Sequence, residues 1–368
     1  MKQSSAHLKV KSMSHHRVTV VIPTFNRPDG LLRAVRSVFA QTLARRDTFA
    51  LVIVDNTPDA TAAVAIETLR AECPDTIRLD AVHAPRPGVA NARNAAMIAV
   101  KTNLVAYLDD DQEAPEPWLE RLLATYEVFP AAVVFGAVVT KLPKDIRDHS
   151  AYLSYFFGRE PDHQTGYIAK PYGTGNALVD FSKVPEGERY FDPAMNVSGG
   201  EDDLFFEQTK KHGGRFAWSS DAPVFEHPER SRLSLQYTMR RAFAYGRAPI
   251  LTALRATPAR HLDVLKWMGV GVFKAVWHGL KWLGLLMLRR KDHAFELDAS
   301  VRGLGKIFWF IEMKFYGGAA LKRQTQSSYP VADQPTRHAS SHESMTERAS
   351  EARLQTLPVA LAHTPKET

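Results

Sequence analysis

Three consecutive aspartates, Asp109, Asp110 and Asp111, follow the apolar run 104–108. Uncompensated charge beside a protein core is costly, so a buried strand that ends in three carboxylates needs a neutralising partner. A divalent cation with hard oxygen ligands is one such partner. Because neighbouring strand residues point to opposite sides, Asp109 and Asp111 can face one ligand while Asp110 faces away. The pattern predicts a site for Mn²⁺ or Mg²⁺ and diphosphate oxygens, although a solvated acidic turn fits the same residues.

A second acidic cluster, residues 201–203, follows two glycines and opens a helix-like segment. Acidic residues at a helix N-terminus are stabilised by the helix dipole, which alone could explain them. The chemical interpretation is a general base that accepts the proton of a sugar hydroxyl, with Asp202 as the first candidate and Glu201 as the second. One carboxylate set for a metal and another for a proton predicts a transferase that acts on a phosphate ester.

Three further segments carry weaker signals. Gly88 leads into a helix whose N-terminus favours anions, and Arg93 on that helix could brace a nucleotide or the aspartates. The glycines and amide of 171–176 suit a sugar pocket or a plain turn. In 226–232, His227 is a candidate third metal ligand, although a histidine in a loop is more often structural.

The elements that must position these residues alternate along the first half of the chain. Strands are expected at 17–22, 51–54, 77–82, 104–108 and 133–139, and helices at 28–39, 60–71, from 89, and at 118–129. This alternation predicts an α/β fold with a mostly parallel sheet between two helical layers. Ligands bind beyond the carboxyl ends of such strands, so Thr24, Asp55 and the three aspartates should share a cleft.

The second half is less regular. Residues 140–200 are rich in glycine, proline and aromatic residues and are expected to form an irregular, substrate-facing insertion. A helix is expected at 201–212, two short strands within 215–225, and a basic helix at 231–247.

The bulk composition describes an ordinary globular protein, since 45% of its 368 residues are apolar and 24% are charged. A single cysteine, Cys73, excludes an internal disulfide framework. Residues 1–16 contain no apolar stretch typical of a signal peptide. These features predict a cytoplasmic location.

The net charge of +7 is unevenly distributed, because residues 227–323 contain 18 Lys and Arg against 6 Asp and Glu. A basic region attracts phosphates in nucleic acid or in an anionic membrane leaflet. Long aliphatic runs interrupt this region, which favours a membrane surface and argues against nucleic acid.

Residues 262–288 form an apolar segment long enough to span a bilayer. Its charged residues and His278 fall on one side of a helix, and three tryptophans lie among the apolar residues. This pattern predicts a helix lying in the membrane interface, with 307–315 as a second such segment. A core helix and a true membrane span are the alternatives. The polar ends, 1–16 and 324–368, are expected to be disordered.

Taken in order, these motifs resemble the inverting glycosyltransferases of family 2, which have the GT-A nucleotide-sugar-binding fold. The resemblance is carried by the strings VIPTFNR at 21–27, VIVDN at 52–56, ARN at 92–94, YLDDD at 107–111 and GED at 200–202. Within the family, the segments GTGN at 173–176, SGGED at 198–202 and RRAF at 240–243 look most like bacterial exopolysaccharide glucosyltransferases of the succinoglycan type.

The resemblance implies roles for individual residues. Asp202 is the expected base, and Asp109 and Asp111 are the aspartates of the metal-binding motif. His227 stays a candidate third metal ligand on its position in 226–232. The donor-binding set is expected to comprise Pro23, Thr24, Arg27, Asp55, Arg93, Asp109 and Asp110. The implied reaction moves a hexose from a UDP donor such as UDP-glucose to a lipid-linked oligosaccharide or other saccharide acceptor, with inversion. The implied place is the cytoplasmic face of the inner membrane, to which the protein binds peripherally.

The resemblance also predicts a domain plan. A GT-A domain at 17–230 would precede a basic amphipathic helical region at 231–323. The family's Gln-x-x-Arg-Trp signature of processive synthases is absent, because Gln236 is followed by Tyr-Thr-Met-Arg and no tryptophan. This departure argues against a processive synthase and leaves the role of Arg240 open.

Three other classes fit less well. A non-catalytic scaffold would keep the fold but lose a base or a metal ligand, and both are present here. A nucleotidyltransferase would be expected to have a glycine-rich, basic loop after its first strand, whereas 23–27 contains no glycine. A phosphatase with an Asp-x-Asp nucleophile would place that pair after its first strand rather than its fourth.

Overall fold

The computed structural model describes residues 16–43, 48–185, 187, 190–196, 199–255 and 258–311. The ends predicted to be disordered lie outside this range, apart from His16. Residues 312–315 of the second predicted interfacial segment also lie outside it.

The described chain is organised around one nine-stranded sheet, ordered β3-β2-β1-β4-β8-β6-β9-β5, with β7 paired to β9. The strands are β1 (His16–Thr24), β2 (Thr48–Asp55), β3 (Arg78–His83), β4 (Leu104–Tyr107), β5 (Gln112–Glu113), β6 (Val133–Thr140), β7 (Gly166–Ile168), β8 (Ala177–Asp180) and β9 (Phe216–Glu226). The α/β fold with strands alternating with helices is confirmed.

Strand direction changes across the sheet. β1 pairs in parallel with β2 and β4, and β2 with β3, as predicted. β8 then runs antiparallel between β4 and β6, so the sheet is mixed. The prediction that 140–200 is an irregular insertion was therefore wrong in part, because Ala177–Asp180 is a fully buried central strand. The two short strands expected in 215–225 are a single strand, β9, which crosses a register shift opposite Gly136.

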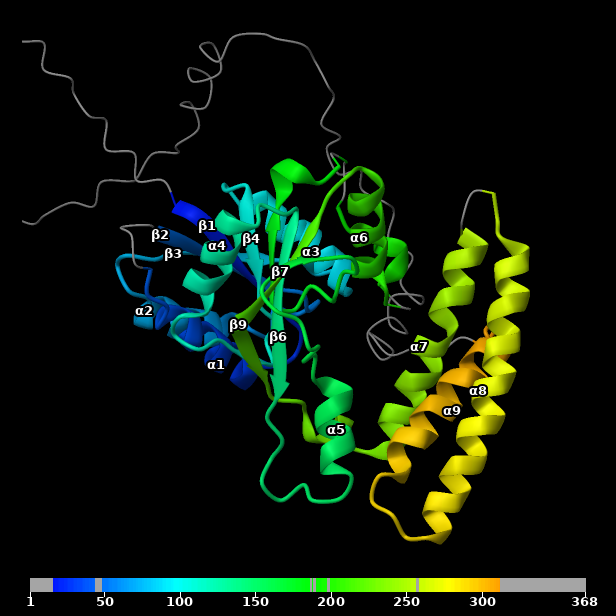
Figure 1. Ribbon diagram of the computed structural model, residues 1–368. Coiled ribbons are helices and arrows are strands. Elements are labelled where there is room, and N and C mark those ends of the chain that lie inside the picture. The colour runs from blue at the N-terminus through cyan, green and yellow to red at the C-terminus, as the bar shows by residue number, and fades with distance from the viewer. Residues whose placement is uncertain are drawn as a thin grey trace, which may run out of the picture. The chain divides into compact units, whose positions relative to one another are not determined.

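Helices cover both faces of the sheet and bury two apolar cores (Figure 1). The first core lies under α1 (Pro28–Phe39), α2 (Ala63–Glu72) and α4 (Trp118–Val128). The second lies under α3 (Val89–Ala99) and α6 (Glu201–Lys211). This three-layer arrangement places the loops at the carboxyl ends of β1 and β4 beside the start of α6.

The C-terminal part of the described chain forms a helical layer of α7 (Leu235–Arg255), α8 (His261–Met287) and α9 (His293–Ile307), which lie side by side (Figure 1). Close packing needs small residues where the helices touch. A Cβ added at Gly303 would lie 2.6 Å from the Ala275 nitrogen of α8, and one at Gly305 would lie 2.1 Å from the Phe243 carbonyl oxygen of α7. α9 is thus wedged between α7 and α8.

The helix α5 (Ser150–Phe157) connects the sheet to this layer. Its Tyr152 and Leu153 share a small core with Met239 of α7 and Ala294 of α9. The Tyr152 hydroxyl also donates a hydrogen bond to Asp298 at 3.0 Å. Among the helices described, α8 included, none is long and apolar enough to cross a membrane.

Candidate active site

A cleft of about 1100 Å³ opens at the carboxyl ends of β1 and β4 and extends to α7. Its walls come from the loop after β1, the aspartates after β4, the start of α6, and one face of α7. Of the residues predicted to form the site, those that line the cleft are Pro23, Thr24, Arg27, Arg93, Asp109, Asp110, Asp111, Glu201 and Asp202. The structure therefore brings together segments spread over 180 positions of the chain.

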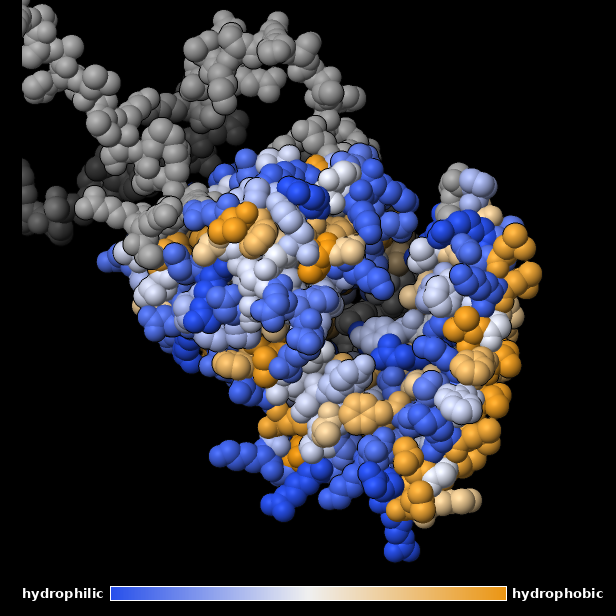
Figure 2. Space-filling view, in the orientation of Figure 1, coloured by the Kyte–Doolittle hydropathy of each residue, from blue (hydrophilic) through white to orange (hydrophobic). Residues whose placement is uncertain are grey.

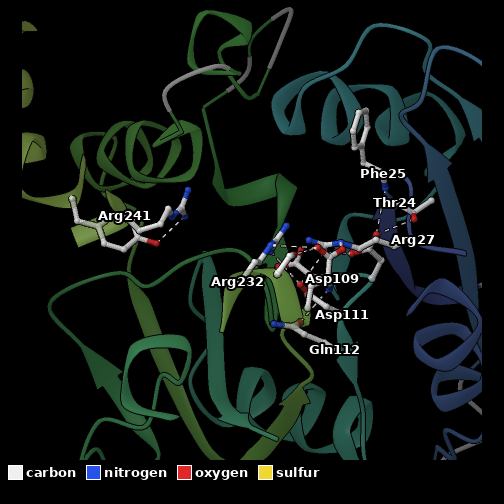
Figure 3. Close-up of polar contacts among 12 residues, drawn as sticks. Thr24, Phe25, Arg27, Asp109, Asp111, Gln112, Arg232 and Arg241 are labelled. Atoms are coloured by element: carbon white, nitrogen blue, oxygen red, sulfur yellow. Dashed lines mark hydrogen bonds and ion pairs between the residues drawn. The ribbon is translucent and has the colours of Figure 1, made fainter. Parts of the chain in front are cut away.

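The loop after β1 is held against the aspartates by charge-assisted hydrogen bonds (Figure 3). The Thr24 hydroxyl donates to Asp110 Oδ2 at 2.9 Å, and Arg27 Nη1 donates to Asp110 Oδ1 at 2.7 Å. The same Arg27 nitrogen donates to Asp111 Oδ2 at 2.8 Å, and Arg232 approaches that oxygen from the other side at 3.8 Å. Asp110 thus anchors the loop through Thr24 and Arg27 while it also lines the cleft.

The carboxylates at this end of the cleft are incompletely neutralised. Burial raises the pKa of Asp111 to about 7, although the neighbouring Arg27 guanidinium lowers it. Burial also raises the pKa of Glu226 well above its ordinary value, and the nearby carboxylates of Asp111 and Asp109 raise it further. Asp109 is more open, with 37% of its side chain exposed.

Asp109 and Asp111 line the cleft and offer carboxylate oxygens, the ligand type that hard divalent cations prefer. Within the described residues, no three His, Cys, Asp or Glu side chains already form a metal-binding group. A cation bound by Asp109 and Asp111 would need further ligands from outside these side chains.

His227 does not belong to this end of the cleft. Its Nε2 lies 3.0 Å from Glu113 Oε2, and His227 lines a second pocket, which Asp110 and Asp111 also line but Asp109 does not. The His227 nitrogen donates a hydrogen bond to the Asp111 carbonyl. The predicted set of Asp109, Asp111 and His227 is corrected: the neighbouring Glu226, and not His227, shares the cleft with the aspartates.

Asp55 is also placed differently from the prediction. Its carboxylate accepts hydrogen bonds from the Thr57 nitrogen at 3.0 Å, the Thr57 hydroxyl at 2.6 Å and the Ala62 nitrogen at 2.8 Å. These bonds close the turn before α2, and Asp55 is absent from the lining of the cleft. The next residue, Asn56, lines the cleft instead and accepts a hydrogen bond from the Gly88 nitrogen.

The two acidic residues that open α6 have different surroundings. Glu201 Oε1 lies 2.6 Å from Arg93 Nη1, and both side chains are buried, at 7% and 6% exposure. Arg93 Nη2 also lies 4.0 Å from Asp109 Oδ1. Glu201 therefore forms a buried ion pair with Arg93. This contact makes Glu201 a poorer candidate for the base than Asp202.

Replacing Glu201 by Gln should destabilise the fold, because Arg93 would keep its buried charge without a close carboxylate. The expected loss is about 3 kcal/mol of unfolding free energy, measured by urea denaturation. Glu72→Gln is the matched control, since the Glu72 pair with Arg36 lies on the surface and should change little. Equal stability of the Glu201→Gln and wild-type proteins would contradict the structural role.

Asp202 faces the cleft without a cationic partner at ion-pair distance among the described residues. Its Oδ1 accepts a hydrogen bond from the Asp203 nitrogen at 2.9 Å, and its Oδ2 accepts one from the Thr174 nitrogen at 3.4 Å. Two backbone donors orient the carboxylate and leave lone pairs available. This arrangement suits a carboxylate that takes a proton from a bound hydroxyl.

Sequence reasoning missed Arg159 altogether. This arginine lines the cleft, and Glu226, Asp109 and Asp202 are the carboxylates that act on its charge. The sequence offers little reason to select Arg159, because a single arginine in a segment predicted to be irregular belongs to no recognisable spacing pattern. The short run Gly158-Arg159 beside aromatic residues gave no motif.

The amino-acid sequence is similar to those of known proteins. A family model described as "Glycosyl transferase family 2" matches residues 19–187. The succinoglycan biosynthesis protein ExoM of Rhizobium meliloti (strain 1021) is 30% identical over 233 residues, which cover 62% of this chain and 72% of that protein. The pre-mycofactocin glycosyltransferase of Mycobacterium tuberculosis (strain CDC 1551 / Oshkosh) is 28% identical over 239 residues, or 64% of this chain and 47% of that protein.

Solved structures give more distant matches. S. aureus TarS has a TM-score of 0.45 at 15% identity, covering 67% of this chain and 41% of that chain. S. aureus TarS 1-349 in complex with UDP-GlcNAc has a TM-score of 0.43 at 13% identity, covering 80% of this chain and 91% of that chain.

Proposed function

The chain belongs to glycosyl transferase family 2, and on that premise we propose that it transfers a hexose from a UDP-linked donor to a saccharide acceptor with inversion. The observation that carries the proposal is the division of the cleft between two kinds of carboxylate. Asp109 and Asp111 gather beside arginines at one end, while Asp202 is held by backbone donors and lies near no cation at ion-pair distance among the described residues. One end suits a metal-bound diphosphate and the other a proton acceptor.

The reaction follows from this division. The acceptor oxygen attacks the anomeric carbon, the bond from that carbon to the diphosphate oxygen breaks, and its electron pair leaves with the diphosphate. The acceptor proton passes to Asp202. Because attack comes from the face opposite the leaving group, an α-linked donor yields a β-linkage. Mn²⁺ or Mg²⁺ held by Asp109 and Asp111 would supply neutralisation of the charge on the diphosphate.

The cleft is slightly larger than a typical pocket for a single ligand. Pockets for a single drug-sized ligand have volumes of about 300–1000 Å³, and this cleft reaches about 1100 Å³. Its far wall is the face of α7 that carries Arg241, Tyr245, Thr252 and Arg255. In Figure 3, Arg241 lies apart from the aspartates, across the space between the two walls. We assign this wall to a lipid-linked or other saccharide acceptor.

Calorimetric titration tests the donor half of the proposal. The protein should bind UDP and one UDP-hexose more tightly with Mn²⁺ than without it. It should show no binding to GDP-mannose. The anomeric configuration of the product, measured by NMR, should be opposite to that of the donor. No binding to any of these nucleotides would favour a non-catalytic scaffold.

We also propose that the protein works peripherally at the cytoplasmic face of the inner membrane. The support comes from α8, whose outward face exposes large apolar side chains (Figure 2). Phe273, Val276 and Leu280 are 65%, 57% and 63% exposed on this face. His278 and Lys281 instead bond to Glu296 of α9. Residues 260–311 contain nine Lys and Arg against four Asp and Glu, which complements anionic headgroups.

The triple variant Phe273→Ser, Val276→Ser, Leu280→Ser should weaken binding to vesicles containing anionic lipid at least about tenfold, because it removes three of the large apolar side chains exposed on this face. Sedimentation with vesicles measures the effect. The control triple variant replaces Val64, Ile98 and Val128 by Ser, since these are also exposed apolar residues, at 81%, 75% and 70%. Unchanged vesicle binding in the first variant, or an equal loss in the control variant, would refute the membrane assignment.

A further inference from the structure

The glycine loop, Gly173–Asn176, separates the two chemical ends of the cleft. A Cβ added at Gly175 would lie 2.4 Å from Asp109 Oδ2, and one added at Gly173 would lie 3.3 Å from Asp202 Oδ2. The Thr174 nitrogen between them donates to Asp202 Oδ2. This loop therefore contacts both the aspartate of the diphosphate end and the proposed base.

The Arg159 guanidinium binds the backbone of this loop. Its Nη1 donates to the Gly173 carbonyl at 2.8 Å, and its Nη2 donates to the Gly136 carbonyl at 3.1 Å. Nη2 also donates to the Gly175 carbonyl and, at 3.4 Å, to the Asn176 carbonyl. The backbone of Arg159 is in turn fixed to β6, because it exchanges hydrogen bonds with Val138 at 2.7 and 3.0 Å. One guanidinium thus ties the loop to the rigid sheet.

The charge of Arg159 also interacts with carboxylates on both sides of the glycine loop. Burial lowers its pKa to about 10, with the carboxylates of Glu226, Asp109 and Asp202 opposing that shift, so the guanidinium is protonated at neutral pH. It is a cation that acts on both ends of the cleft. Its Nε is buried and has no hydrogen-bond partner in the described structure, which shows that the fork of Nη1 and Nη2 carries the contacts.

We propose that Arg159 is a positioning residue for sugar transfer, which fixes the glycine loop and thereby the spacing between Asp202 and the diphosphate end of the cleft. The inference rests on the proposed function. It assigns no proton or substrate contact to Arg159, because the side-chain hydrogen bonds of Arg159 in the described structure go to backbone carbonyls. Its effect should appear in the rate of transfer, since small errors in the position of reacting groups can cost about 100-fold.

The test compares Arg159→Lys and Arg159→Ala with the wild-type enzyme. Lysine keeps a charge but lacks the planar fork that reaches several carbonyls at once. We expect kcat to fall about 30-fold to 100-fold in both variants while the affinity for UDP with Mn²⁺ stays within about threefold. Millimolar guanidinium should restore part of the rate in Arg159→Ala only. Arg121→Lys is the control, because Arg121 also donates to a backbone carbonyl, that of Asp221, outside the cleft.

A second variant covers the case in which Arg159→Ala does not fold. Gly173→Ala leaves Arg159 in place but puts a methyl group 3.3 Å from both Arg159 Nη1 and Asp202 Oδ2. It should lower kcat and spare UDP affinity. Unchanged kcat in Arg159→Lys, or a loss of kcat matched by an equal loss of UDP affinity, overturns the positioning role. A wild-type enzyme that transfers no sugar would instead refute the proposed function.

Discussion

Replacing Asp202 by Asn should lower kcat about 1000-fold while leaving the affinity for UDP and the donor unchanged. Asparagine has the same shape and can still accept the hydrogen bond from the Asp203 nitrogen, so the start of α6 should be preserved. It cannot take the acceptor proton, and loss of a general base typically costs about 100-fold to 10,000-fold. Single-turnover transfer, with binding measured separately by calorimetry, checks both halves of the expectation.

The neighbouring variant Asp203→Asn provides the contrast. Asp203 also lines the cleft and opens α6, but its backbone nitrogen, and not its carboxylate, contacts Asp202. Its substitution should cost less than about tenfold in kcat. If Asp203→Asn is as slow as Asp202→Asn, or if Asp202→Asn transfers at the wild-type rate, the base is another residue.

The location of the site could be predicted because parallel strands end at one edge of a sheet. Thr24 ends β1 and Asp109 follows β4, and the alternation of strands and helices predicts that such strands are parallel and end at the same edge. Asp202 reaches the same edge because α6 packs on the second core through Phe205 and Phe206. For these side chains, residue type and the alternation of strands and helices were enough to predict a shared cleft.

The partner of each side chain could not be predicted in the same way. Asp55 ends β2 as expected, but its carboxylate turns into the local loop because Thr57 and Ala62 offer nearby donors. Glu201 and Asp202 are adjacent in sequence, yet only Glu201 meets Arg93, 108 positions away. Such distinctions depend on rotamers and long-range packing, which neighbouring residue types do not encode.

The central strand β8 also could not be predicted from the local sequence. Ala177–Asp180 is a short apolar run in a segment rich in turn residues, and short runs give no reliable period. It forms a strand because the edges of β4 and β6 offer backbone partners on both sides. Tertiary pairing, and not local preference, fixes this strand and the Arg159-bound glycine loop that precedes it.

Replacing Asp111 by Ala should remove most of the Mn²⁺-dependent gain in UDP affinity. Asp111 lies between Arg27 and Arg232 and is one of two aspartates proposed to hold the metal, so its loss removes a ligand and leaves excess positive charge. We expect the gain to fall about 100-fold, because disrupting the ligand environment of a metal site commonly costs this much. Calorimetry with and without Mn²⁺ measures the gain, and Asp80→Ala on β3, outside the cleft, is the control.

The pH dependence of the same gain tests the assignment independently. Because burial raises the pKa of Asp111 to about 7, its carboxylate binds a proton as the pH falls through 7, and a protonated carboxyl is a poor metal ligand. The Mn²⁺-dependent gain should therefore be full above about pH 8 and should decline as the pH falls toward 6. In Asp111→Ala this decline should disappear. A wild-type gain that stays constant from pH 8 to 6, or an Asp111→Ala protein that keeps the full gain, would show that the metal is bound without Asp111.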